Sequence, residues 1–132
     1  MEARAEKRAL LLIVDDDARA ASMLARMLDD DGFDTEVTLD GAAALARLTR
    51  DPVPDALLTD YHLPHADGLA VARYARSRRA EMPIVLLTGD PRTLAKASAA
   101  APLEGATLVI TKPLDYAELV RHLGVVLAPT TA

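Results

Sequence analysis

Residues 9–17 read Ala9-Leu10-Leu11-Leu12-Ile13-Val14-Asp15-Asp16-Asp17, an unbroken apolar run that ends at three aspartates. An apolar run of this length without alternation is typical of a strand that is buried on both faces of a parallel sheet. The aspartates can begin a helix, because acidic side chains satisfy the free N–H groups of a first turn. The stretch therefore predicts the strand-to-helix unit of an α/β domain.

The rest of the chain repeats this unit. We expect further strands at 33–39, 55–59, 84–88 and 107–111, and helices at 18–28, 40–50, 69–79, 92–101 and 115–126. Alternation of five strands with five helices predicts an α/β fold: a doubly wound, five-stranded parallel sheet of order 2-1-3-4-5, flavodoxin-like, with helices on both faces. All 132 residues are expected to form a single domain whose core spans about 9–128.

Composition excludes several classes of protein. The chain is 51% hydrophobic and 27% charged, which suits one globular domain and not a disordered chain. Its longest apolar run, 9–14, is far shorter than the roughly 18–20 residues of a membrane span. A net charge of −5 argues against direct nucleic-acid binding, and the lack of cysteine excludes disulfides and thiolate chemistry. Because no signal-peptide pattern follows the N-terminus, we expect a cytoplasmic protein.

Carboxylates follow two strands that this topology makes neighbours. Asp15 and Asp16 come directly after the first strand, and Asp60 comes directly after the third. Those two strands flank the topological switch point, where folds of this kind bind ligands. Each aspartate alone can be a helix cap or a turn residue. Together they would repel one another, and a hard cation such as Mg²⁺, which prefers oxygen ligands, relieves that repulsion.

Two further polar residues fall on the same rim. Thr88 ends the fourth strand and Lys112 ends the fifth. Separately, each can be an ordinary strand-end residue. Beside a carboxylate and metal cluster, however, a hydroxyl donor and an ammonium group are what a bound phosphoryl group requires.

Four segments, taken in order and spacing, resemble the response-regulator receiver domains (CheY-like) of two-component signalling over about residues 9–128. They are Leu12-Ile13-Val14-Asp15-Asp16-Asp17, then Asp60-Tyr61-His62-Leu63-Pro64-His65-Ala66-Asp67-Gly68, then Leu86-Leu87-Thr88-Gly89, and finally Thr111-Lys112-Pro113.

The resemblance implies a role for each of these residues. Asp60 would accept a phosphoryl group from a histidine kinase or a histidine phosphotransfer protein, with Thr88 and Lys112 contacting that group. Mg²⁺, or Mn²⁺ in its place, would be held by Asp15, Asp16, Asp60 and the backbone carbonyl of His62. Pro64 and Gly68 would shape the loop, and Pro113 would follow the lysine in a cis peptide.

The resemblance also implies how such a domain works. It would act as a signalling domain, not an enzyme, and would signal through a conformational change to a downstream protein that the sequence does not identify. A dimer that forms on phosphorylation fits this role, and no membrane contact is expected. One position departs from the family pattern: Val109 stands where a tyrosine or phenylalanine switch residue is common.

The sequence leaves one enzymatic alternative open. Phosphatases of the haloacid-dehalogenase type place an Asp-x-Asp motif after an apolar strand, so Asp15 could be a nucleophile. Against this, Ala18 stands where that family usually has glycine, and the alternative leaves Asp60 and its loop unexplained.

Overall fold

The apolar run near the start of the chain forms β1 (Leu10–Val14), the strand next to one edge of the sheet. The computed structural model describes residues 8–90, 92 and 108–127. Apart from Arg92, the helix expected at 92–101 lies outside these residues. None of the helices in the described ranges combines the length and the apolar character that crossing a bilayer requires.

The strands form one parallel sheet with the expected order. β2 (Asp34–Thr38), β3 (Ala56–Asp60), β4 (Ile84–Thr88) and β5 (Leu108–Thr111) join β1 in the order β2-β1-β3-β4-β5. Every residue of β3 and β4 is buried, whereas β2, at the edge, is half exposed. The fold class and the strand order are therefore confirmed.

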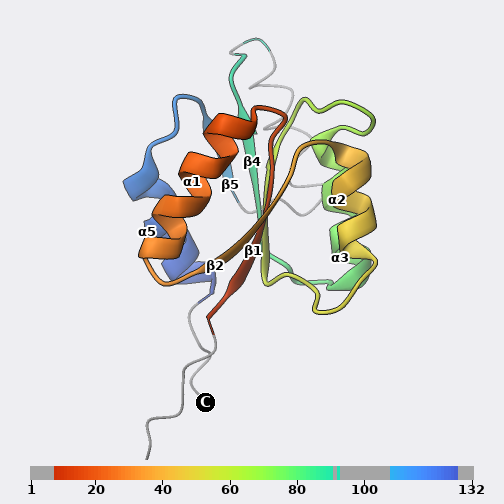
Figure 1. Ribbon diagram of the computed structural model, residues 1–132, viewed down its shortest axis with the longest axis horizontal. Coiled ribbons are helices and arrows are strands. Elements are labelled where there is room, and N and C mark those ends of the chain that lie inside the picture. The colour runs from red at the N-terminus through yellow and green to blue at the C-terminus, as the bar shows by residue number, and fades with distance from the viewer. Residues whose placement is uncertain (1–7, 91, 93–107, 128–132) are drawn as a thin grey trace, which may run out of the picture.

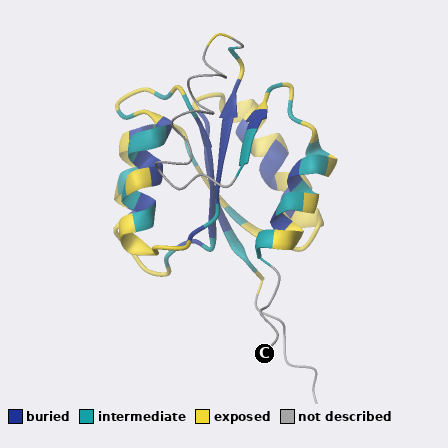
Figure 2. Ribbon diagram, turned by 180° about the vertical axis from the view of Figure 1, so that it is seen from behind, coloured by how far each residue is buried: buried dark blue, intermediate teal, exposed yellow. Residues whose placement is uncertain are grey.

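Helices cover both faces of the sheet, as Figure 1 shows. α1 (Ala18–Asp30) and α5 (Tyr116–Val126) lie on one face, and α2 (Gly41–Leu48) and α3 (Gly68–Arg78) on the other. Each face has its own apolar core, because neighbouring strand residues point to opposite sides: Leu11 and Ile13 pack toward α1, Leu12 and Val14 toward α2. In Figure 2 the central strands are accordingly buried, and exposed residues lie on the outer sides of the helices and in the loops.

Each described helix begins with an aspartate. The carboxylates of Asp17, Asp40, Asp67 and Asp115 each accept a hydrogen bond from the backbone N–H three residues further on. The aspartates at positions 17, 40 and 115, which stand where the sequence predicts helices to begin, are caps, and Asp67 adds a fourth. These capped helix starts follow the carboxyl ends of the strands, so they surround one edge of the sheet, which we call the carboxyl edge.

Candidate functional site

Three carboxylates meet at the carboxyl edge. Asp15 follows β1 directly, and Asp16 is next to it. Asp60 is the last residue of β3, whereas the sequence predicted that this strand ends at residue 59. One carboxylate oxygen from each lies within 4.8 Å of the others. Asp15 and Asp60 are buried, with 5% and 7% of their surface exposed, while Asp16 is exposed. The pairing of β1 with β3 thus brings together acids 45 residues apart in sequence.

One ammonium group reaches into this cluster. The Nζ of Lys112 donates hydrogen bonds to Asp60 Oδ2 at 3.1 Å and to Asp15 Oδ2 at 3.2 Å. The Nζ of Lys112 also lies 2.9 Å from Asp60 Oδ1 and forms an ion pair with it. The geometry of this contact is not that of a hydrogen bond, and among the described residues this buried oxygen has no hydrogen-bond donor. The peptide between Lys112 and Pro113 is cis, as expected.

Burial dominates the electrostatics of the site. It raises the pKa of Asp60 to about 7; the hydrogen bond and charge of Lys112 lower this value, and the neighbouring Asp15 raises it. Burial alone would lower the pKa of Lys112, but its hydrogen bonds to Asp60 and Asp15 outweigh this, and the pKa is raised. The two buried acids therefore share the ammonium group of Lys112, with Asp16 close by, so the crevice favours either a proton on Asp60 or an added cation.

The other expected site residues lie on the same edge. Thr88 is buried at the end of β4, and its hydroxyl accepts a hydrogen bond from the N–H of Asp90 at 3.3 Å. Its carbonyl accepts the N–H of Lys112 at 2.9 Å, which places the lysine beside the threonine. The imidazole of His62 packs edge-on against Tyr61, with ring centres 4.8 Å apart. A metal-binding role for the His62 carbonyl stays a prediction.

Two glycines fix the loop between β3 and α3. A Cβ on Gly68 would lie 2.2 Å from the carbonyl oxygen of Asp60, so only glycine permits this approach. Gly41, at the start of α2, is equally close to the carbonyl of Ala66 and donates its N–H to the carbonyl of Pro64 at 3.1 Å. The motif singled out Gly68, but no local signal pointed to Gly41, because its contact joins segments far apart in sequence.

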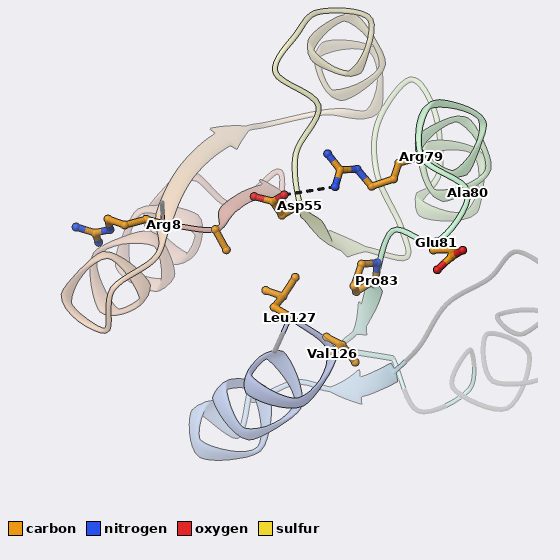
Figure 3. Close-up of a pocket in the computed structure, with 9 residues that line it drawn as sticks. Arg8, Asp55, Arg79, Ala80, Glu81, Pro83, Val126 and Leu127 are labelled. Carbon is orange, nitrogen blue, oxygen red and sulfur yellow. Dashed lines mark hydrogen bonds and ion pairs between the residues drawn. The ribbon is translucent and has the colours of Figure 1, made fainter. Parts of the chain in front are cut away.

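The opposite edge of the sheet, at the amino ends of the strands, is hollowed. We call it the amino edge; Figure 3 shows its cavity of about 620 Å³, lined by Arg8, Ala9, Asp55, Arg79, Ala80, Glu81, Pro83, Val126 and Leu127. Its charged residues include an ion pair, Arg79 with Asp55 at 3.5 Å. The crowded cluster of three carboxylates lies at the carboxyl edge and makes that edge the candidate site.

Comparisons with known proteins agree with this geometry. A family model of the response regulator receiver domain matches residues 11–124. The chain is 36% identical over 120 residues to the response regulator MprA of Mycobacterium leprae, covering 91% of this chain and 51% of that protein. It is 41% identical over 117 residues to the DNA-binding response regulator MtrA of Mycolicibacterium paratuberculosis, covering 88% of this chain and 50% of that protein. The chain thus spans about half the length of these relatives.

Solved structures of response regulators superpose well on this chain. The chemotaxis response regulator CheY4 of Vibrio cholerae superposes with a TM-score of 0.79 at 27% identity, covering 91% of this chain and 99% of that one. A CheY-like receiver domain from Methanospirillum hungatei superposes with a TM-score of 0.82 at 24% identity, covering 90% and 93%, and shows the shared fold. None of these matches supports the phosphatase alternative with Asp15 as nucleophile. The chain belongs to the response regulator receiver domains, the phosphoacceptor signalling modules of two-component systems.

Proposed function

We propose that Asp60 is the phosphoacceptor of this domain and that residues 1–132 act as a single receiver domain. One observation carries the assignment: Asp60 is buried within the carboxylate cluster, and its two oxygens lie 2.9 Å and 3.1 Å from the Nζ of Lys112. Asp15 is buried as well, but its Oδ1 already accepts the N–H of Asp17 at 2.9 Å, so it is committed to holding the start of α1.

Mg²⁺ fits the donor set of this crevice. Two buried and one exposed carboxylate offer oxygen ligands, and the buried Oδ1 of Asp60 has no hydrogen-bond donor among the described residues. Asp16 and Asp60 would bind through their side chains, Asp15 largely through water, and His62 through its carbonyl; Mn²⁺ has the same ligand preferences. When bound, the ion supplies positive charge that offsets the negative charge of carboxylate and phosphoryl oxygens.

The residues of the chain position and neutralise the incoming group. A carboxylate oxygen of Asp60 forms a bond to phosphorus while the N–P bond of a phosphohistidine breaks, and the bonding electron pair goes to the imidazole nitrogen. Lys112 moves from Asp60 to a phosphoryl oxygen, and the hydroxyl of Thr88 donates to another. Burial of Asp60 excludes water and strengthens both interactions.

The partners follow from this chemistry. The phosphodonor is a histidine kinase or a histidine phosphotransfer protein, and the output is a conformational change read by a downstream protein; dimer formation on phosphorylation is one such output. The domain assists its own phosphorylation without acting on a separate substrate, so it is not an enzyme in the ordinary sense. Val109, in β5, lacks the long side chain of an aromatic switch and, being β-branched, is stiff at χ1. A cytoplasmic location and the absence of direct nucleic-acid or membrane binding stay predictions.

Labelling with a small phosphodonor tests the acceptor. The full chain is incubated with acetyl phosphate and Mg²⁺, and intact mass followed by peptide mapping reports the number and position of phosphoryl groups. We expect one group, on Asp60, which Asp60→Ala or a chelator abolishes and Asp34→Asn, at the amino edge, leaves unchanged. Stoichiometric labelling of Asp60→Ala, or a label on Asp15 in the wild type, would contradict the proposal.

A further inference from the structure

The peptide group that joins Asp60 to Tyr61 is held at both of its polar ends. The N–H of Tyr61 donates to the carbonyl of Leu87 in β4 at 2.7 Å. At the other end, the hydroxyl of Thr59 donates to the carbonyl of Asp60 at 3.0 Å. Because a peptide group is planar, these two bonds together fix its tilt at the end of β3.

The same carbonyl is also closed in by α3. Gly68 approaches it so closely that a Cβ would stand 2.2 Å from the oxygen, and the N–H of Gly68 donates to the next carbonyl, that of Tyr61, at 2.9 Å. Thr59 itself is fully buried. Loss of its hydroxyl would therefore leave the Asp60 carbonyl without that donor in a place that water does not readily reach.

We propose that Thr59 is a positioning residue for phosphoryl transfer: through the Asp60 carbonyl, its hydroxyl sets the place of the acceptor carboxylate. The inference rests on the proposed role of Asp60. Without the Thr59 bond the Asp60–Tyr61 peptide is free to shift, and a shift displaces the Cα atoms on either side of it. It thus moves both the carboxylate and the backbone that leads to His62, two of the expected metal ligands.

The carboxylate has little else to hold it. Its described contacts are with Lys112 and with Asp15, and the lysine must give up part of its contact when a phosphoryl group arrives. The backbone therefore determines the position of the carboxylate at the moment of transfer. Small misplacements of reacting groups cost large factors in rate, up to about 100-fold for 1 Å.

Thr59→Val tests the hydroxyl alone, because valine keeps the shape and the β-branching that suit a buried strand. We expect a folded protein whose dissociation constant for Mg²⁺ rises about 3- to 10-fold and whose labelling by acetyl phosphate slows about tenfold. Thr59→Ser restores the donor and is expected to stay within about twofold of the wild type in both measurements. Should Thr59→Val not fold, Thr59→Ala gives the same comparison with Thr59→Ser.

The matched control is Thr38→Val, at the end of β2. The hydroxyl of Thr38 is likewise buried but has no hydrogen-bond partner among the described residues, so its removal should change neither Mg²⁺ affinity nor labelling. Equal Mg²⁺ affinity and equal labelling rates in the wild type and Thr59→Val would overturn the inference, as would equal losses in Thr59→Val and Thr59→Ser. A wild type that is not labelled on Asp60 would instead overturn the proposed function, and the Mg²⁺ affinities would still decide whether Thr59 positions the acid.

Discussion

The carboxyl edge and the amino edge of the sheet use the same residue types in opposite ways. At the amino edge two acids each have their own cation: Arg8 lies 3.3 Å from Asp34, and Arg79 lies 3.5 Å from Asp55. Asp55 in addition accepts the N–H of Leu10 at 2.8 Å and so fastens the start of β1. At the carboxyl edge, the two buried acids Asp15 and Asp60 both bond to the ammonium group of Lys112, and within the described part of the chain the third acid, Asp16, has no cation of its own.

The ion pairs of the amino edge contribute to stability, whereas the buried acids of the carboxyl edge are of the kind found at functional sites. Pairs such as those of the amino edge are partly exposed, and pairs of that kind typically contribute about 0.2–1 kcal/mol each. The carboxyl edge, by contrast, buries two acids side by side and raises the pKa of one of them. Such an arrangement costs stability in the metal-free protein, and perturbed acids of this kind gather at functional sites.

The largest expected effect is on the rate of phosphorylation, and it is measured by removing one cation from each edge in separate variants. Lys112→Ala should slow labelling of Asp60 by about 100-fold or more, because it deletes the group that neutralises the phosphoryl oxygens. Arg79→Ala, at the amino edge, should label at the wild-type rate. Rates from a phosphodonor time course followed by intact mass make the comparison, and equal rates for the two variants would remove the distinction between the edges.

Mg²⁺ should stabilise the carboxyl edge in particular. At a concentration of 100 times its dissociation constant, the ion should raise the free energy of unfolding by about 2.7 kcal/mol. Asp16→Asn should lose most of this gain, while its metal-free form is at least as stable as the wild type, because one repelling charge is gone. Asp34→Asn should keep the full gain. Thermal melts with Mg²⁺ and with a chelator measure this gain. A melting temperature that does not change in millimolar Mg²⁺ would argue against the site.

Asp55 should matter for folding and not for phosphorylation. Asp55→Ala leaves the N–H of Leu10 without its partner and should lower the free energy of unfolding by about 1–2 kcal/mol. Asp55→Asn keeps an acceptor for that N–H and should lose less. Urea unfolding measures both variants. Slower labelling of folded Asp55→Ala would mean that the two edges are coupled.

The smallest effect is expected for an exposed pair. Arg78 donates to Asp51 at 3.0 Å, but the Asp51 side chain is 87% exposed. Arg78→Ala should therefore change the free energy of unfolding by about 0.5 kcal/mol or less. A loss above about 1 kcal/mol in the same urea experiment would show that surface pairs contribute more here than the comparison of the two edges assumes.

Much of the candidate site could be predicted from the sequence because it depends on topology. In a parallel sheet the carboxyl ends of all strands point to one edge, so residues that end strands must meet there. Asp60, Thr88 and Lys112 are of this kind, and their place on one edge follows from the strand order. Helix caps such as Asp17 are local and equally predictable.

Contacts between distant segments could not be predicted in this way. Arginine side chains are mostly exposed, yet Arg47 of α2 is 5% exposed, because its guanidinium pairs with Glu36 of β2 and donates to the carbonyls of Arg50 and Pro52. The approach of Gly41 to Ala66 is of the same type.

The sequence by itself therefore determined the alternation of strands and helices, the edge at which the acids meet and the residue types that form the site. Only the tertiary structure decided how closely those groups approach, which of them are buried and which backbone carbonyls orient them. The physical reason is the distance along the sequence over which each feature is determined. Strand and helix patterns depend on neighbouring residues. Burial, and the close contacts of Gly68 and Thr59 with the Asp60 carbonyl, depend on how the folded segments pack together.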